Sequence, residues 1–389
     1  MIDYRAVLND KVQAIKPSGI RRFFDIANEM DNVISLSIGE PDFTTPWHVR
    51  QEGIHSLEDG KTWYSPNRGF MELREEISRW FKRHYHVEYD PKEEVLVTVG
   101  GSEALDLCLR SLIRPGDEVL IPEPSFVCYV PLTEMAGGVP VTIETKAEDK
   151  FRLTSEALRA KITPKSKLLI LPFPNNPTGA VMRRKHLIEI AEVVKEYHLT
   201  VLSDEIYGAL TYGDTNHVTF SAIDDMRERT IVCNGFSKAF AMTGWRLGYA
   251  VGPKEIIGAM TKLHQYAIMS APTTAQYAAI EAMRNGDEDI VYMREQYDMR
   301  RRLIVDGFNA MGLTCFEPEG AFYVFPCIKK TGLTSEEFCE KLLYDEHVAV
   351  VPGTAFGPSG EGFVRVSYSY SIKHITEALS RIGHFISQF

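Results

Sequence analysis

Cysteine is scarce in this chain, and no two cysteines lie at a spacing that suits a metal. The six cysteines are scattered without a C-x-x-C pair, which indicates neither a zinc site nor a disulfide scaffold. Reduced thiols fit a cytoplasmic protein best. The close histidine pair His84 and His86 has no carboxylate or cysteine pattern around it and predicts a solvated helix end. We therefore expect no metal site.

Long apolar runs and an excess of positive charge are also missing. No uninterrupted apolar run approaches the ~18 residues of a membrane helix, and the first residues lack the apolar stretch of a signal peptide. The formal net charge of -10 argues against a nucleic-acid or anionic-membrane partner, because those surfaces require a basic footprint. With 389 residues, the chain is long enough for one large domain and a smaller one.

From Glu94 onward, short apolar runs alternate with helical stretches. This pattern is typical of an α/β fold with a mostly parallel sheet covered by helices on both faces. Seven strands are expected, at 95–99, 118–121, 139–143, 168–171, 200–202, 230–232 and 247–251. Helices between them are expected to begin near Ser102, Ser125, Thr154, Arg183 and Lys254. In such sheets, ligands bind at the carboxyl ends of the strands.

The chain is expected to divide into three parts. Residues 1–45 form an N-terminal arm that contributes to a small domain, 46–290 form the large α/β domain, and 291–389 form the small α+β domain. After Gln296 the periodicity becomes helical from Tyr297 to Met311. Alternating strands follow at 320–325 and 363–368, and an amphipathic helix closes the chain from Ile372 to Phe389.

The stretch from Ile231 to Gly252 predicts a strand, a polar turn and another strand. Lys238 lies in the turn between Phe236 and Phe240, where partial desolvation makes its amine a nucleophile suited to an aldehyde. Ser237 and Arg246 bracket it with donors that a phosphate requires. Together these groups suggest pyridoxal phosphate held as a Schiff base, although the Ser-Lys pair alone is more typical of a surface lysine.

Glycines and an aromatic residue follow two other strands. Gly101, Ser102 and Glu103 open a helix, where free backbone N–H groups and the helix dipole favour an anion. A simple helix cap at Ser102 is the alternative. Phe126 offers a face on which a pyridine ring stacks, or it belongs to the core. Gly39 leaves its amide open to a ligand, or it forms a plain turn.

Four polar residues complete the candidate site. A carboxylate at Asp204 keeps a pyridine nitrogen protonated, and Tyr207 donates to a phenolic oxygen; an exposed acidic pair with Glu205 is the alternative. Asn176, between two prolines, is a positioned amide donor. Arg365 lies within an apolar strand and must meet an anion, either a substrate carboxylate or a carboxylate of the protein.

The string S-K-x-F-x-M-T-G-W-R-L-G from Ser237 to Gly248 resembles the lysine signature of the fold-type I, class I and II aminotransferases. The segments G-x-P-D-F, N-P-T-G, D-E-x-Y and F-V-R-V-S-Y also match that family in order, from Gly39 to Arg365. Chance is a poor explanation for so many matches in the right order.

The resemblance implies a role for each candidate residue. At the cofactor it places Lys238, Asp204, Tyr207, Asn176 and Phe126, with Gly101, Ser102, Glu103, Ser237 and Arg246 around the phosphate. At the substrate carboxylate it places Arg365 and Gly39, and Asn176 also lies near the substrate. Tyr64 is implied to reach the cofactor phosphate of the neighbouring subunit, which predicts a homodimer with shared active sites.

The resemblance also implies the activity. The expected reaction moves an amino group from an L-amino acid to a 2-oxo acid such as 2-oxoglutarate by a ping-pong mechanism, with Lys238 as the general base. The sequence as a whole, including the string around Lys238, is most similar to aromatic or broad-specificity members of the aspartate aminotransferase group. Some aspartate-using members carry a lysine where this chain has Ser102, which disfavours aspartate.

Several alternatives remain open at this stage. The chain could be an aspartate aminotransferase, or a carbon–sulfur β-lyase or aminocyclopropane carboxylate synthase on the same scaffold. A ligand-sensing relative fused to a DNA-binding domain is disfavoured by the intact lysine and by the lack of a basic patch.

Overall fold

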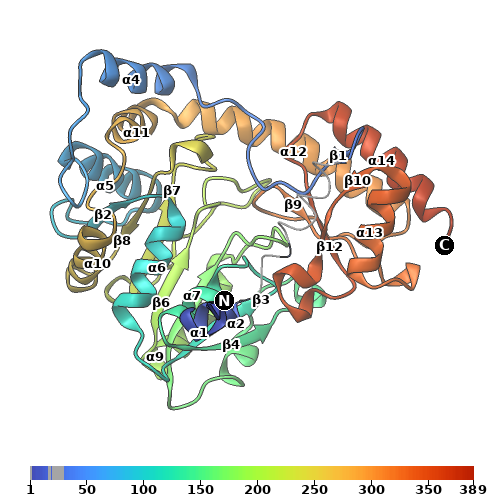
Figure 1. Ribbon diagram of the computed structural model, residues 1–389, viewed down its shortest axis with the longest axis horizontal. Coiled ribbons are helices and arrows are strands. Elements are labelled where there is room, and N and C mark those ends of the chain that lie inside the picture. The colour runs from blue at the N-terminus through green and yellow to red at the C-terminus, as the bar shows by residue number, and fades with distance from the viewer. Residues whose placement is uncertain (1, 16–18, 20–29) are drawn as a thin grey trace.

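The computed structural model describes residues 2–15, 19 and 30–389 (Figure 1). Its centre is a seven-stranded sheet in the order β2-β8-β7-β6-β5-β3-β4. The strands are β2 (Val95–Thr98), β3 (Glu118–Glu123), β4 (Val139–Glu144), β5 (Ser166–Pro172), β6 (Thr200–Asp204), β7 (Thr230–Gly235) and β8 (Gly248–Val251). Only β8 runs antiparallel to its neighbours in this sheet. The seven expected strands and the mostly parallel sheet are therefore confirmed.

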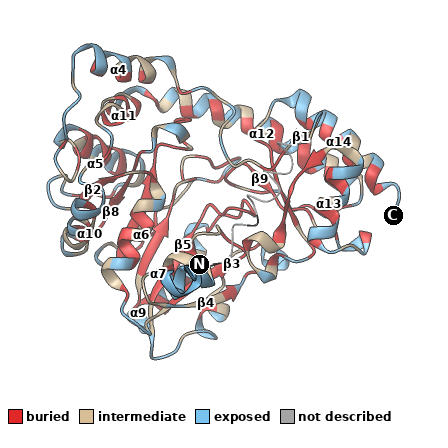
Figure 2. Cartoon of the chain, in the orientation of Figure 1, coloured by how far each residue is buried: buried red, intermediate tan, exposed pale blue. Residues whose placement is uncertain are grey.

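The central strands of the sheet are buried on both faces, which explains their apolar middle positions. On β5, Leu168 and Ile170 pack on the side of α6 (Gly101–Leu112), α7 (Tyr129–Met135) and α10 (Lys254–Ala267). Leu169 and Leu171 point to the other side, toward α8 (Ser155–Arg159) and α9 (Arg184–Glu196). Figure 2 shows that buried residues dominate the strands of this sheet.

Two expected helix starts were wrong. The helix expected near Ser125 begins at Tyr129, because the Ser125 amide donates to the carbonyl of Phe356 at 3.1 Å instead of entering a helix. The helix expected from Tyr297 begins at Asp287, as α12 (Asp287–Ala310). Three acidic residues in its first turn favour that earlier start, because they interact well with the positive end of the helix dipole.

Three further helices cover the sheet near β2 and β8. They are α4 (Trp47–Glu58), α5 (Met71–Tyr85) and α11 (Thr273–Asn285). The apolar stripe of α5, at Leu73, Ile77, Trp80 and Phe81, is buried in the same cluster as β2 and α11. From there α12 crosses to the C-terminal part of the chain (Figure 1).

The C-terminal part forms a second core. It contains a three-stranded antiparallel sheet in the order β11-β12-β9, with β9 (Tyr323–Val324), β11 (Val351–Pro352) and β12 (Val364–Ser367). Around it lie α13 (Ser335–Glu346) and α14 (Ile372–Ile386). In the arm, β1 (Ile34–Ser35) pairs in parallel with β10 (Val348–Ala349).

The remaining elements are short. The helices α1 (Tyr4–Val7) and α2 (Asp10–Ala14) bury no residue, and arm residues 1, 16–18 and 20–29 lie outside the described part of the chain. The 3₁₀ turns are η1 (Ala147–Asp149), η2 (Phe220–Ala222), η3 (Arg227–Arg229), η4 (Thr243–Trp245), η5 (Lys329–Thr331), η6 (Gly353–Phe356) and η7 (Pro358–Gly360). The limits 1–45, 46–290 and 291–389 stay a prediction.

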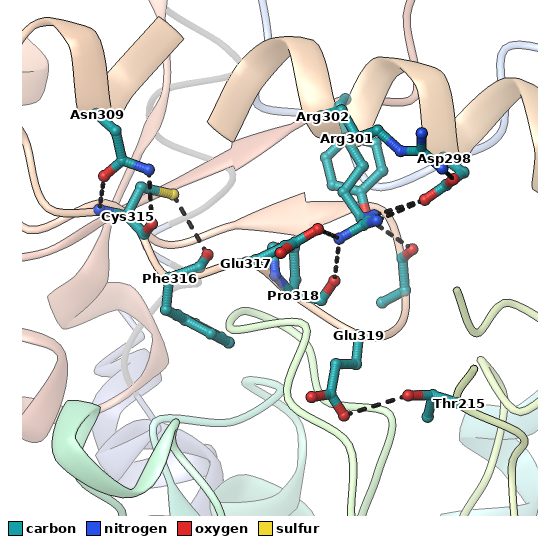
Figure 3. A network of polar contacts seen from close by, with 12 residues as sticks. Thr215, Asp298, Arg301, Arg302, Asn309, Cys315, Phe316, Glu317, Pro318 and Glu319 are labelled. Atoms are coloured by element: carbon teal, nitrogen blue, oxygen red, sulfur yellow. Dashed lines mark hydrogen bonds and ion pairs between the residues drawn. The ribbon is translucent and has the colours of Figure 1, made fainter. Parts of the chain in front are cut away.

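Ion pairs anchor the segment that leads into β9. Arg301 on α12 donates to Asp298, to Glu317 at 2.5 Å and to the carbonyl of Pro318 at 3.2 Å (Figure 3). On the other side, Glu319 accepts from Arg152 at 3.1 and 3.2 Å and from Arg183 at 3.1 Å. The segment is thus held between α12 and the loops of the large sheet, immediately before a strand that enters the candidate site.

Within residues 2–15, 19 and 30–389, none of the helices combines the length and apolar character needed to cross a bilayer. In the same residues, no three histidine, cysteine or acidic side chains gather in a way that suits a metal ion.

Candidate active site

A cavity of about 630 Å³ opens at the carboxyl ends of the central strands. All the candidate residues except Glu103 and Tyr64 line it, namely Gly39, Gly101, Ser102, Phe126, Asn176, Asp204, Tyr207, Ser237, Lys238, Arg246 and Arg365. They come from positions spread over most of the chain, yet the fold brings them to one place. This is the location that a parallel sheet favours for a ligand.

Lys238 follows β7 and directs its amine into the cavity, where Nζ donates to the carbonyl of Gly39 at 2.6 Å. Burial lowers the pKa of this amine to about 8. The desolvation has a different source from the expected one. Phe236 and Phe240 pack in the core with β2 and α5, whereas the rings that face Nζ belong to Tyr207, at 5.8 Å, and Phe322, at 5.7 Å.

Asp204 ends β6 and is buried. Its Oδ2 accepts a hydrogen bond from the Tyr129 hydroxyl at 2.8 Å, and its Oδ1 accepts from the Ile206 amide at 3.2 Å. Burial raises the pKa of the carboxyl to about 6, although both hydrogen bonds and the nearby Lys238 act in the opposite direction. A cationic ligand nitrogen beside it would stabilise its charged form.

Glu205, the alternative carboxylate, lies outside the cavity in a separate buried network. It accepts from Ser203 at 2.7 Å and from Thr219 at 2.9 Å, and it pairs with His217 at 2.8 Å. Its hydrogen-bonding capacity is used by the protein, and the exposed acidic pair considered from the sequence is wrong because both carboxylates are buried. Of these two neighbouring carboxylates, Asp204 is the one that lines the cavity.

The turn after β2 forms a concave anion site. Gly100, with φ of +79°, lies so close to Arg246 that a Cβ there would be 2.7 Å from its guanidinium nitrogen. A Cβ on Gly248 would be 2.5 Å from the backbone of Gly100. The N-terminus of α6, the Ser237 side chain and the Arg246 guanidinium therefore converge where a phosphate fits.

Two candidate side chains lie apart from the cavity. Glu103 turns back, with Oε2 accepting from the Val99 amide at 2.5 Å and Oε1 pairing with His264 at 2.7 Å. Only its backbone amide at the helix start is therefore available to an anion. Tyr64 is 78% exposed and does not line the cavity of its own chain.

Arg365 on β12 is 2% exposed, and no carboxylate of the described residues pairs with it. It donates to Oδ1 of Asn176 at 3.1 Å and to the carbonyl of Ser37, while its buried Nε has no partner in the described residues. Burial lowers the pKa of this guanidinium. A buried guanidinium with a free donor indicates an anionic ligand, and the alternative of a salt bridge has no support among the described residues.

Two tyrosines that the sequence did not single out belong to the site. Tyr129 holds Asp204, and the hydroxyl of Tyr323 lies 2.7 Å from that of Tyr207. Tyr129 lies three residues after Phe126, across the turn before α7, and their rings pack edge to face at 5.9 Å. Tyr323 lies in the apolar string G-A-F-Y-V-F. That string is typical of a core strand and did not indicate a functional residue.

The side chains present fit pyridoxal phosphate. A buried amine at Lys238 suits an aldehyde, the glycine-lined turn with Arg246 suits a phosphate, and Asp204 suits a protonated ring nitrogen. Phe126 is partly buried and lines the same cavity, where a ring could stack on it. Arg365 remains free to bind a second anion.

Comparisons with known proteins agree with this chemistry. The model of the family described as aminotransferase class I and II matches residues 31–382. An aspartate aminotransferase of Pyrococcus abyssi is 46% identical over 96% of this chain and 97% of its own length. Aromatic-amino-acid aminotransferase 2 of Thermococcus litoralis is 44% identical over 98% of both chains.

Solved structures show the same likeness. The aromatic aminotransferase of Pyrococcus horikoshii OT3 superposes with a TM-score of 0.91 at 44% identity, covering 94% of this chain and 99% of that one. The aspartate aminotransferase of Thermus thermophilus, in a structure with maleate, has a TM-score of 0.93 at 40% identity, covering 97% and 99%.

Proposed function

The chain belongs to the class I and II aminotransferases, and we propose that it prefers aromatic amino acids or a broad range of L-amino acids as donors, with a 2-oxo acid such as 2-oxoglutarate as acceptor. Its cofactor is pyridoxal phosphate, which supplies an aldehyde for the amino group and a cationic ring that stabilises negative charge at the substrate Cα. The single observation that supports the site best is that Lys238, Asp204 and Arg365 face one cavity.

At the cofactor, each group has a task that its surroundings support. Lys238 holds the aldehyde and then moves the proton of the substrate Cα through Nζ, and a pKa of about 8 leaves a useful fraction of neutral amine near neutral pH. Asp204 pairs with the ring nitrogen, and the hydroxyl of Tyr207 and the amide of Asn176 donate to the phenolic oxygen. Gly101, Ser102, Glu103 (through its amide), Ser237 and Arg246 surround the phosphate.

At the substrate, Arg365 binds the α-carboxylate with its guanidinium, and the Gly39 amide lies beside it. The carbonyl of Gly39 accepts from Nζ of Lys238, so this contact must be replaced when the amine joins the aldehyde. Arg365 donates to the carbonyl of Ser37 and still has its Nε for the substrate carboxylate. Ordered groups at both ends of the substrate keep its Cα close to Nζ of Lys238 and exclude water.

The donor preference rests on the walls of the cavity. Ile38 and Leu105 line it, which gives an aromatic side chain an apolar surface, and Ser102 gives a distal carboxylate no lysine at position 102. Aspartate transamination is the nearest alternative, since the relatives include aspartate aminotransferases. A carbon–sulfur β-lyase activity on the same scaffold is the second.

A homodimer with shared active sites is part of the proposal, supported by Tyr64, which is exposed and does not line the cavity of its own chain. A cytoplasmic location is also proposed, and the six free cysteines support it.

A half-reaction survey tests the function. Purified protein with its cofactor is mixed with each amino acid, and conversion of the aldehyde form to the amine form is followed by absorbance. We expect phenylalanine and tyrosine to convert it rapidly, and parallel double-reciprocal lines in the full reaction. A preference for aspartate of about a hundredfold, or ~2.7 kcal/mol in transition-state binding, would overturn the donor assignment.

Two controls complete the survey. Lys238→Ala should lose the absorbance of the imine between lysine and cofactor, and turnover, together. Pyruvate and ammonia formed from a donor with a sulfur leaving group, without an oxo-acid acceptor, would identify a lyase instead.

A further inference from the structure

Tyr323, on β9, is buried, lines the cavity and contacts three parts of the site. We propose that Tyr323 is a positioning residue that fixes the hydroxyl of Tyr207 and the guanidinium of Arg365 at the same time. This rests on the proposed function, because Tyr207 and Arg365 serve the cofactor and the substrate only there.

The first contact sets the direction of a hydrogen bond. The hydroxyls of Tyr207 and Tyr323 are 2.7 Å apart, and each carries one hydrogen. If Tyr207 donates its hydrogen to the cofactor, the hydrogen between the two tyrosines must come from Tyr323. Burial raises the pKa of Tyr323, so this hydroxyl keeps its hydrogen at neutral pH. A donor behind Tyr207 polarises it and makes it the stronger donor.

The second contact orients the substrate-binding cation. The guanidinium of Arg365 lies over the Tyr323 ring at 4.6 Å, and Phe356 faces the same group at 4.9 Å. The aromatic face stabilises a charge that has no carboxylate partner among the described residues. The ring and the hydroxyl of Tyr323 therefore have separable tasks.

The third contact explains a glycine. A Cβ at Gly39 would lie 2.3 Å from the Tyr323 hydroxyl oxygen but 3.3 Å from the ring carbon that carries it. The hydroxyl thus fills the space beside the backbone whose carbonyl accepts from Lys238. Removing only the hydroxyl should make room for a small side chain at position 39.

The main experiment uses the enzyme with its cofactor and records the pH midpoint of the absorbance change of the bound cofactor. Tyr323→Phe should raise this midpoint by about half a pH unit, because a weaker Tyr207 donor stabilises the cofactor's phenolic oxygen less. The dissociation constant of 3-phenylpropionate, a carboxylate probe, should stay within about twofold, because the ring remains. Tyr323→Leu should raise the pH midpoint and also raise the dissociation constant of 3-phenylpropionate about fivefold or more.

Tyr368→Phe is the matched control, since Tyr368 is buried in the same core, donates to the carbonyl of Ala321 at 3.1 Å and does not line the cavity. It should change neither quantity. An unchanged midpoint in Tyr323→Phe would overturn the proposal. If the unaltered protein shows no cofactor absorbance at all, it is the proposed function that fails.

A second measurement needs no cofactor. In the cofactor-free protein, Gly39→Ala should lower Tm by about 2–4 °C, and most of this loss should disappear when Tyr323→Phe is present as well. Additive effects of the two substitutions would show that the hydroxyl does not fill the space beside Gly39, and would overturn the contact on which the proposal depends.

Discussion

The hydroxyl of Tyr129 donates a hydrogen bond of 2.8 Å to Oδ2 of Asp204, and both side chains are buried. Even with this bond and that from the Ile206 amide, burial raises the pKa of the carboxyl to about 6. Without a cationic partner, the ionised carboxylate is therefore a source of instability, which is typical of a group arranged for a ligand and not for the fold.

The first prediction follows from this relationship. Between the ordinary pKa of 3.8 and about 6, the folded protein holds a proton on Asp204 that the unfolded chain releases, so stability falls as pH rises through this window. We expect Asp204→Asn to increase the free energy of unfolding of the cofactor-free protein at pH 7.5 by about 1–2 kcal/mol. Removing the carboxylate whose pKa is raised should add ~3 kcal/mol to the free energy of unfolding, and losing one hydrogen bond should subtract ~1 kcal/mol from it.

Urea denaturation at pH 4 and pH 7.5 measures the free energy of unfolding of both proteins. The extra stability of Asp204→Asn should vanish near pH 4. Glu205→Gln is the control at the adjacent position. It should destabilise the protein, because Ser203, Thr219 and His217 all bind that carboxylate. An Asp204→Asn protein less stable than the unaltered one at pH 7.5 would contradict the argument.

The sequence predicted the central sheet well for a physical reason. Strands buried on both faces are apolar throughout, as at Leu168 to Leu171, and polar turns after them mark the edge where ligands bind. The site residues that escaped prediction depend on packing between distant elements. Tyr129 meets Asp204 from 75 residues away, and Tyr323 meets Tyr207 from 116 residues away. No local pattern reports such a contact.

Arg365 gives the second prediction. Arg365→Lys keeps a charge but loses the planar fork, and Asn176 loses a donor. Truncating one side of a buried, hydrogen-bonded charge pair costs about 2 kcal/mol or more, so KM for the amino acid should rise about 30-fold or more. The absorbance of the bound cofactor should stay the same. Following the half-reaction by absorbance at increasing amino-acid concentrations measures both KM and the cofactor's absorbance. A KM within about threefold of the original would count against Arg365 as the partner of the substrate carboxylate.

Glu319 gives the third prediction, which concerns stability. Burial alone would raise its pKa, but hydrogen bonds and charge from Arg183 and Arg152 lower it. A carboxyl with a lowered pKa contributes stability above its ordinary pKa and loses that contribution as pH falls. We expect Glu319→Gln to reduce the free energy of unfolding at pH 7 by about 1–2 kcal/mol, with little effect below pH 4.

Glu317→Gln is the matched control two residues away (Figure 3). Glu317 also meets an arginine, Arg301, but its side chain is 63% exposed. Its loss should cost about 0.5 kcal/mol or less, because exposed ion pairs contribute little. Equal losses from the two substitutions, measured by urea denaturation, would show that the Arg152 and Arg183 contacts do not stabilise the fold.

The last prediction tests whether Tyr64 completes the cavity of a second copy. Lys238→Ala and Tyr64→Ala should each reduce activity at limiting cofactor. When the two variants are unfolded, mixed in equal amounts and refolded together, about half of the dimers should contain one chain of each kind. In these dimers the chain that retains Lys238 receives an intact Tyr64 from its partner, so about a quarter of the original activity should return.

The control mixes Lys238→Ala with Arg365→Ala. Both residues line the same cavity of one chain, so no mixed dimer regains a complete site and activity should stay low. Recovery in the first mixture alone can arise only if Tyr64 acts across the subunit boundary. If neither mixture recovers although each variant refolds and forms dimers, Tyr64 serves its own chain or none, and its 78% exposure then has another cause.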